Sequence, residues 1–260
     1  MHVEAADALL ASLPFWFLAI FVGGLGAIWG SFAGALCARW PSGESAATGR
    51  SRCDKCGKTI ASFDLIPLIS FAVLKGKCRS CHARISTGIF AMEIAAVILG
   101  ILPLFLFLPS QAVAAASFAW LLLPLIVLDI RHLWLPDRLT LLLAIAGILA
   151  GPILMPEIGW IDRMAGGIGG YAVLDIIRRI FLAVRHREGM GAGDPKLLGA
   201  IGIWLGWQAL PLAILLASVI GLIWALSAKL LYRREVTAVA FGAMLGTSSL
   251  LYVWSMASWM

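Results

Sequence analysis

Two aspartates beside long apolar segments could work together as an acid and a base. Asp194 ends the run Gly-Met-Gly-Ala-Gly-Asp at 189–194 and opens an apolar segment, and Asp129 lies at the end of an earlier one. Two carboxylates that meet at one membrane surface can share a proton, because like charges held close cannot both ionise. The ionised group could then activate water while the protonated group polarises a peptide carbonyl, which is aspartic-peptidase chemistry.

Gly191, Gly193 and Lys196 surround Asp194 and could support the same site. The glycines predict either close approach of a second chain or a positive φ. We expect Gly193 to leave room for an extended substrate, so that a β-branched residue there impairs cleavage more than folding. Lys196 could pair with lipid phosphates or favour ionisation of the two aspartates.

Other acidic residues in or beside the apolar segments have simpler explanations. Asp137 follows a proline and precedes an apolar run, so capping of a helix is favoured over a role in the site. Asp175 has Arg178 and Arg179 at helical spacing, which favours an internal ion pair. For Glu93, a buried hydrogen-bonding role and a role in the site are equally compatible with the sequence.

Two Cys-x-x-Cys pairs, Cys53 with Cys56 and Cys78 with Cys81, are typical of a metal site built from four thiolates. Each pair can form a tight turn that directs two sulfurs at one ion. The pattern therefore predicts a closed, structural Zn²⁺ site. Two disulfides are the alternative, but the segment is expected in the reducing cytoplasm, where disulfides are rare.

The composition indicates an all-α polytopic membrane protein. The chain has 260 residues, is 61% hydrophobic and only 13% charged, and has a mean hydropathy of +0.95. The formal net charge of +6 reflects basic cytoplasmic loops rather than binding to nucleic acid. The eight expected spans lie near 14–36, 87–108, 112–130, 138–156, 161–183, 195–208, 209–230 and 236–258.

The distribution of basic residues predicts how these spans are oriented. An outward N-terminus places 37–86, 131–137, 184–194 and 231–235 in the cytoplasm, and every Lys and Arg except Arg163 then lies in or beside a cytoplasmic segment. Glycines at 26, 30 and 34 predict close helix packing in the first span. The expected parts are an N-terminal transmembrane helix (1–36), a cytoplasmic four-cysteine domain (37–86) and a membrane domain that carries the aspartates (87–260).

The sequence resembles the type IV prepilin peptidases, a family of aspartic peptidases with a Gly-x-Gly-Asp signature. The resemblance rests on Gly-Ala-Gly-Asp at 191–194, on Asp129 before Leu-Pro-Asp at 135–137, and on the two cysteine pairs. Two departures are Ala-Phe-Gly-Ala at 240–243, where the family usually has Pro-Phe-Gly-Pro, and His82, where a glycine commonly follows the last cysteine.

The resemblance implies a bacterial inner-membrane enzyme with its active site on the cytoplasmic face. Such enzymes remove the basic leader of type IV prepilins and type II secretion pseudopilins after a glycine, and they methylate the new N-terminus with S-adenosylmethionine. By the same resemblance Asp129 and Asp194 are the catalytic pair, and the four-cysteine domain is linked to methylation.

Other functions are compatible with some of the same residues. A transporter or assembly protein could use intramembrane carboxylates as a proton relay. A peptidase that has lost methylation is a further alternative. The expected partners are a prepilin or pseudopilin substrate and membrane lipids, with no nucleic acid, and the sequence leaves the oligomeric state open.

Overall fold

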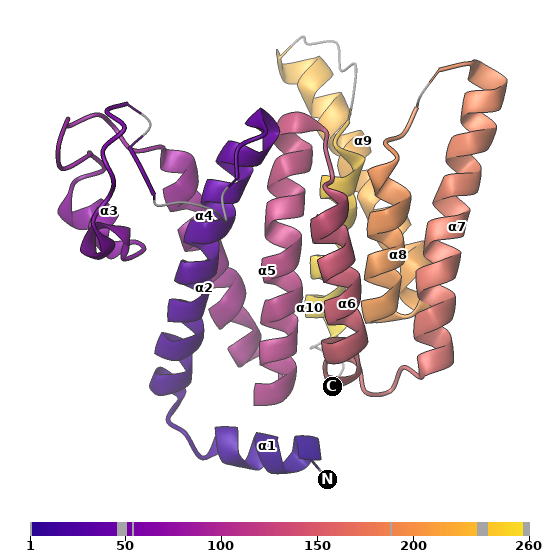
Figure 1. Cartoon of the computed structure of the whole chain (residues 1–260). Coiled ribbons are helices and arrows are strands. Elements are labelled where there is room, and N and C mark those ends of the chain that lie inside the picture. Colours follow the sequence, from indigo (N-terminus) through magenta and orange to yellow (C-terminus); the bar gives the residue numbers. More distant parts are fainter. Residues whose placement is uncertain (1, 46–50, 54, 188, 233–238, 257–260) are drawn as a thin grey trace.

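The protein is a bundle of helices throughout the residues that the computed structural model describes, which are 2–45, 51–53, 55–187, 189–232 and 239–256. The α-helices are α1 (His2–Ala11), α2 (Phe15–Arg39), α3 (Ile69–Val73), α4 (Thr87–Ile101), α5 (Pro109–His132), α6 (Asp137–Leu154), α7 (Trp160–Arg185), α8 (Gly193–Leu205), α9 (Leu210–Tyr232) and α10 (Phe241–Met256). The 3-10 turns are η1 (Trp40–Ser42), η2 (Ser62–Leu65), η3 (Leu102–Phe105) and η4 (Trp207–Ala209). Figure 1 shows the long helices side by side, with α1 lying across one end. The predicted all-α class is confirmed.

Among the described residues, five helical segments are long and apolar enough to cross a membrane. They are Phe15–Ser42, Thr87–Phe105, Pro109–His132, Asp137–Leu154 and Trp207–Leu230. The other three predicted spans form α7, α8 and α10. Helix α8 has 13 residues and α10 has 16, fewer than the ~20 that cross a bilayer. The architecture is therefore that of a multi-pass membrane protein, and the count of eight spans stays a prediction.

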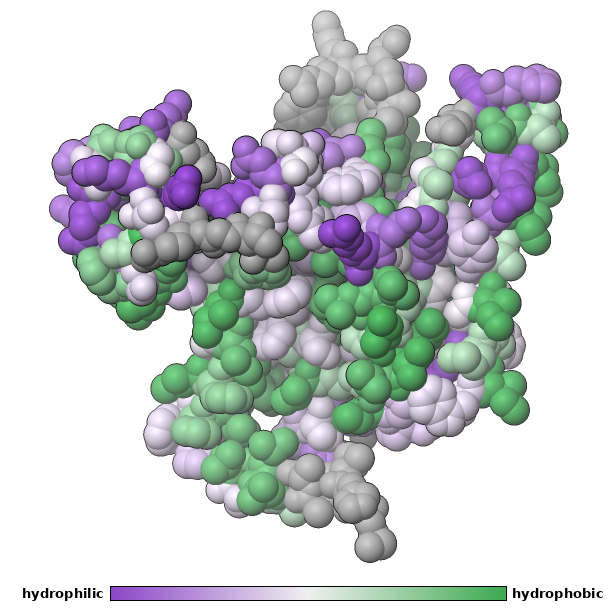
Figure 2. Space-filling model, viewed as in Figure 1, coloured by the Kyte–Doolittle hydropathy of each residue, from purple (hydrophilic) through white to green (hydrophobic). Residues whose placement is uncertain are grey.

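Three of the four loops that were predicted to share one side lie at one end of the bundle, as far as the structure describes them. The described residues of 37–86, 131–137 and 184–194 lie at the upper end in Figure 1, and α1 lies at the lower end. Residues 233–235 of the fourth predicted loop are outside the described residues. Hydrophilic side chains gather at the upper end in Figure 2, and hydrophobic ones cover the visible face below them.

Helices α2 and α4 pack closely because glycines remove side chains from their contact. A methyl group at Gly26 would lie 2.6 Å from the carbonyl oxygen of Ala96, and one at Gly30 would lie 2.6 Å from that of Met92. The predicted packing role of this glycine stripe is confirmed.

A proline inside α5 creates a free carbonyl that a tryptophan satisfies. Pro124 has no N–H, so the carbonyl oxygen of Trp120, one turn earlier, lacks its usual helical donor. The indole Nε1–H of Trp29 on α2 donates to this oxygen at 2.7 Å. In the membrane a free carbonyl is costly, so this bond fixes α2 against α5.

Arg163 is fully buried at the lower end of α7. It is the basic residue that did not fit the predicted cytoplasmic placement of Lys and Arg. Its Nη1 donates to the carbonyl oxygens of Ile203 and Trp204, and its Nη2 donates to those of Gly151 and Met155. The two carbonyls of α8 belong to its last turn, where helical donors run out, whereas the two at the end of α6 also accept from backbone N–H groups. One guanidinium thus joins the lower ends of three helices.

Helix α8 lies among other helices and is positioned by them. It packs against α6 and α7 and also contacts α9 and α10. Trp204, fully buried on α8, donates its indole N–H to the carbonyl oxygen of Leu143 on α6 at 2.8 Å. These contacts fix the height and rotation of α8, and therefore the position of Asp194 in its first turn.

Candidate active site and metal centre

Asp129 and Asp194 come from opposite ends of their helices and are buried at the same end of the bundle. Asp129 lies in the last turn of α5, and Asp194 is the second residue of α8. Each is only 5% exposed.

Both carboxylates approach Gly242 of α10. A methyl group added at Gly242 would lie 3.0 Å from Oδ1 of Asp194 and 3.1 Å from Oδ2 of Asp129. A carboxylate oxygen of each aspartate therefore borders the same small space. Two carboxylates this close favour a state in which they hold a single proton between them.

The first turn of α10 supplies backbone donors to this acid pair. The Ala243 N–H donates to Oδ2 of Asp129 at 2.7 Å, and the Gly242 N–H is directed at both carboxylates. The first N–H groups of a helix have no partner within the helix, so they are available to bind negative charge. These donors were not predicted from the sequence. The signal that could have found them is the glycine at the start of an apolar helix on the same side.

The departure from Pro-Phe-Gly-Pro at 240–243 does not prevent the chain from turning into α10. The helix begins at Phe241, whose N–H donates to the carbonyl oxygen of Val239 at 2.8 Å. Ala243 also has an N–H, which a proline would lack, and that N–H is the donor to Asp129.

The glycines before Asp194 have different surroundings. A methyl group at Gly193 would lie 2.6 Å from Cβ of Leu135, so the space beside this glycine is filled by the chain itself. The prediction that Gly193 leaves room for substrate is therefore wrong, since a side chain here would disturb folding. Gly191 is less enclosed: the nearest atom to an added methyl group would be Oδ2 of Asp194, at 3.4 Å.

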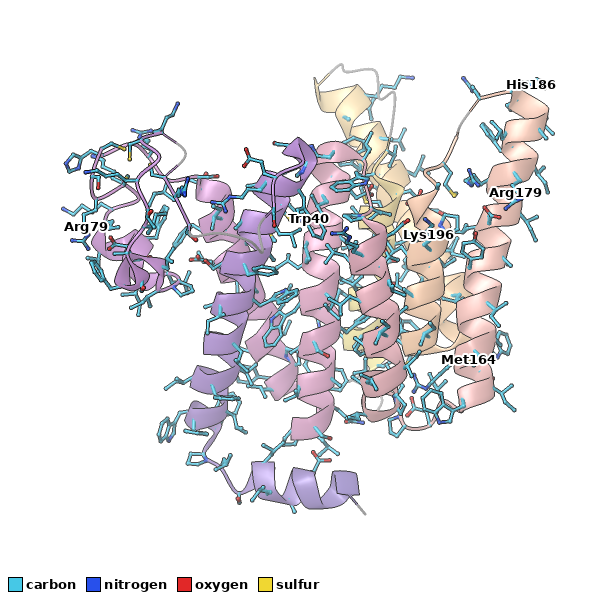
Figure 3. All side chains as sticks on the ribbon, in the orientation of Figure 1. Trp40, Arg79, Met164, Arg179, His186 and Lys196 are labelled. Atoms are coloured by element: carbon cyan, nitrogen blue, oxygen red, sulfur yellow. The ribbon has the colours of Figure 1, made fainter. Side chains whose placement is uncertain are left out.

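Asp137 and Lys196 form an ion pair beside the acid pair. The Lys196 Nζ donates to Oδ1 of Asp137 at 2.6 Å, and Figure 3 shows Lys196 on α8 next to α6. The prediction that Asp137 caps α6 is wrong. Pro136 is the residue at the N-cap, and no side chain caps the helix, because the carboxylate turns to the ammonium group of α8.

Glu93 connects the cysteine-containing segment to the membrane helices. Its Oε2 accepts from the backbone N–H of Leu68 at 2.8 Å. Of the two roles considered for Glu93, this contact is the buried hydrogen-bonding one. The ring of Phe71 stacks on Phe90 of α4 with centroids 4.2 Å apart. These contacts fix the start of α3 against α4.

Asp175 forms the predicted ion pairs on α7. It accepts from Arg178 at 3.0 Å and from Arg179 at 2.6 Å. Both partners lie on the same helix, so this buried carboxylate is already neutralised.

The four cysteines Cys53, Cys56, Cys78 and Cys81 form one cluster in the segment beside α3. Their sulfurs all lie within 4.8 Å of one another, and those of Cys53 and Cys81 are 3.8 Å apart. A tetrahedral ion with metal–sulfur bonds of about 2.3 Å requires sulfurs about 3.8 Å apart, so the cluster fits a structural metal site. All four are free thiols, which does not favour the disulfide alternative.

The two cysteine turns are closed by the same kind of backbone hydrogen bond. The Cys53 carbonyl accepts from the Gly57 N–H at 2.8 Å, and the Cys78 carbonyl accepts from the His82 N–H at 3.0 Å. Gly57 has a φ of +68° and His82 a φ of +54°. His82 therefore adopts the left-handed conformation for which glycine is better suited.

The second cysteine turn is also held by an ion pair outside the membrane. Arg79 donates through Nε and Nη2 to the carboxylate of Asp64, with a shortest distance of 2.7 Å. This hydrogen bonding lowers the pKa of Asp64. The guanidinium also lies over the ring of Phe63, 5.1 Å from its centroid. These contacts hold the metal-binding turn against η2.

Replacing Cys53 and Cys78 together with serine is expected to remove most of the bound metal, because each turn then keeps a single thiolate. Metal content of the purified protein, measured by mass spectrometry, checks this. Cys37→Ser is the matched control, since Cys37 is buried on α2 and donates its Sγ–H to the Pro124 carbonyl. Unchanged metal content in the double variant would contradict the metal site.

Gly242→Ala is expected to reduce at least ~100-fold the leader cleavage that the sequence resemblance implies, because the added methyl group lies 3.0 and 3.1 Å from the two carboxylates and also displaces Leu135. Cleavage of a prepilin in detergent solution measures the effect, and the unfolding temperature of the variant shows whether the fold is kept. Gly24→Ala is the control, because a methyl group there meets no atom within 4 Å. Equal activity of the two variants would show that this space is not used.

Comparison with known proteins relates the chain to a single family. A model of the type IV leader peptidase family matches residues 116–226, and a model of the bacterial peptidase A24 N-terminal domain matches residues 25–107. No solved structure matches the chain.

Relatives from several bacteria share the name prepilin leader peptidase/N-methyltransferase. That of Aeromonas salmonicida is 36% identical over 215 residues, which cover 81% of this chain and 74% of the relative. That of Dichelobacter nodosus is 36% identical over 203 residues, with 78% and 71% covered. That of Pseudomonas aeruginosa is 39% identical over 175 residues, with 66% and 60% covered. The chain therefore belongs to the type IV leader peptidase family.

Proposed function

We propose that this protein is a membrane aspartic endopeptidase that removes the basic leader of type IV prepilins or type II secretion pseudopilins. The observation that carries the proposal is the pair of buried carboxylates, Asp129 and Asp194, which border the same space beside Gly242. The names of the relatives support the choice of substrate. The reaction takes place at the cytoplasmic face of the bacterial inner membrane, the side on which the predicted cytoplasmic loops lie.

The acid pair acts through one shared proton. The ionised carboxylate takes a proton from a water molecule as the water oxygen bonds to the peptide carbonyl carbon, and the protonated carboxyl donates a hydrogen bond to the carbonyl oxygen. The carbon–nitrogen bond then breaks, and the leaving amine takes a proton from a carboxyl group. The N–H groups of Gly242 and Ala243 keep the carboxylates oriented throughout.

The substrate approaches as an apolar helix that must be unwound at its scissile bond. It lies against α5 and α8, which carry the two aspartates. Gly191 supports the site by leaving space beside the Asp194 carboxylate, and Gly193 does so by letting Leu135 pack against the start of α8. The ion pair of Lys196 with Asp137 holds α6 and α8 together at the same level.

The second activity is methylation of the new N-terminus with S-adenosylmethionine, as the N-methyltransferase part of the relatives' name suggests. Residues 37–86 form the cytoplasmic domain linked to this activity, after the N-terminal membrane part of 1–36, which contains α1 and most of α2, and before the peptidase part of 87–260. The metal of the four-cysteine cluster is Zn²⁺, for which four thiolates in a closed tetrahedron are typical. Its role is to fold the domain, and Glu93 anchors that domain to α4.

Co-expression with a prepilin tests both activities in one measurement. The mass of the processed pilin is expected to show loss of the leader after the glycine and addition of one methyl group at the new N-terminus. A pilin that keeps its leader would contradict the peptidase assignment. A shortened pilin without the methyl group would support the peptidase assignment and contradict the methyltransferase assignment.

A further inference from the structure

A cavity of about 540 Å³ lies beside the acid pair, between the end of α2 and the loop that joins α5 to α6. This volume is in the range of small-molecule sites. Its walls include Trp40 and Glu44 from one segment and Trp134, Leu135, Asp137 and Arg138 from the other. In Figure 3 Trp40 lies at the upper end of α2, the end at which the predicted cytoplasmic loops gather.

Two tryptophans give the cavity aromatic walls set at an angle. The ring centroids of Trp40 and Trp134 are 6.4 Å apart, and the ring planes are tilted by 57°. Gly43, with a φ of +76°, ends η1 and donates its N–H to the Trp40 carbonyl, while Leu133, with a φ of +50°, ends α5 just before Trp134. Aromatic faces bind flat heterocycles by stacking and attract cations.

Charged groups of both signs line the same cavity. Asp137 is paired with Lys196 at 2.6 Å, so its charge is balanced within the protein. Glu44 and Arg138 are both exposed and bring one negative and one positive charge. A ligand with a planar ring, a cationic centre and a zwitterionic end would match these walls. A purely basic ligand would be repelled by the positive charge of Arg138.

The cavity and the acid pair share a wall. Leu135 lines the cavity, and its side chain also lies against Gly193 and Gly242, where added methyl groups would each meet it at 2.6 Å. The two halves of the lining come from different family segments. Trp40 and Glu44 lie within 25–107, and residues 134–138 lie within 116–226.

We propose that this cavity is the binding site for S-adenosylmethionine, an inference that rests on the methyltransferase part of the proposed function. Trp40 and Trp134 hold the adenine ring and the sulfonium cation, Arg138 holds the carboxylate, and Glu44 holds the ammonium group. When bound, the cofactor supplies a methyl group to an amine, which releases a proton. Because Leu135 separates the two sites, an amine formed at the acid pair has only a short distance to move.

Binding to the purified full-length protein in detergent, measured by equilibrium dialysis with S-adenosylmethionine, tests the proposal. Trp40→Ala and Trp134→Ala are each expected to weaken binding about ten-fold. The parent should prefer S-adenosylmethionine over S-adenosylhomocysteine, which lacks the positive charge, and both variants should lose this preference. Glu44→Gln and Arg138→Gln should weaken binding of S-adenosylmethionine but not of methylthioadenosine, which lacks the amino-acid end.

Controls separate this proposal from the function on which it rests. Trp16→Ala, at an exposed position on α2 outside the cavity lining, should bind as the parent does. Leader cleavage should stay at the parent rate in the Trp40 and Trp134 variants. Parent-like binding in these variants, or a raised KM for prepilin with unchanged cofactor binding, would overturn the cavity assignment. If the parent itself bound no S-adenosylmethionine, the proposed methylation would fail together with the site, while the peptidase assignment would stand.

Discussion

Asparagine in place of either Asp129 or Asp194 is expected to reduce leader cleavage to the background level while the protein stays folded. The carboxamide has nearly the same size as the carboxylate, and its oxygen can still accept from the Ala243 N–H at position 129. It can neither take a proton from water nor share one with the partner carboxyl. General acid–base catalysis by a positioned side chain contributes roughly 10²–10⁴-fold, and each substitution disables both partners of the pair.

Processing of a co-expressed prepilin in membranes measures this effect, and thermal unfolding of the purified variants reports the fold. Asp175→Asn is the matched control, because Asp175 is also buried but is paired with Arg178 and Arg179. We expect that variant to cleave near the parent rate. The acid pair would be excluded as the catalytic group if Asp129→Asn or Asp194→Asn processed prepilin nearly as fast as the parent. A proton relay for transport would then be the better interpretation.

Arg163→Met should have the largest effect on stability, a loss of about 2–6 kcal/mol in the free energy of unfolding, from about 1–3 kcal/mol for each acceptor that is left unsatisfied. Methionine fills much of the volume but removes the guanidinium donors from four carbonyl oxygens. Those of Gly151 and Met155 keep a backbone N–H donor. Those of Ile203 and Trp204 lose a donor inside a membrane protein, where an unsatisfied acceptor is costly.

The unfolding temperature in detergent measures this loss. Arg185→Met, at an exposed position near the other end of α7, should leave the temperature almost unchanged. Arg163→Lys should fall between the parent and Arg163→Met, because an ammonium group cannot reach four carbonyls on two helices. A parent-like unfolding temperature for Arg163→Met would show that the four hydrogen bonds contribute little.

The features that sequence predicted well are local ones. The cysteine turns follow from the spacing of Cys53 with Cys56 and of Cys78 with Cys81, because each turn is complete within a few residues. The glycine stripe of α2 was predicted for the same reason, since small residues at four-residue spacing form one face of a helix. The all-α class follows from long apolar segments alone.

The features that sequence could not predict depend on partners far away in the chain. The Ala243 N–H donates to Asp129, which lies 114 positions earlier. Almost every residue has a backbone N–H, so the residue types do not indicate which one is the donor. Arg163 was visible as an exception, but its acceptors are carbonyls, which every residue has. Asp137 was expected to satisfy its own helix, whereas Lys196, 59 positions later, binds it instead.

The short length of α8 has a consequence for the water that the reaction consumes. Its 13 residues rise about 20 Å, so the helix is about 10 Å too short for a hydrocarbon layer of about 30 Å. Asp194 is at the upper end of this short helix. Because α8 is enclosed by its neighbouring helices, its short length leaves Asp194 below the upper end of α7 (Figure 1). A helix of full length would extend past this level, whereas the short one keeps the acid pair within reach of water from the polar end of the bundle, and water is the second reactant of hydrolysis.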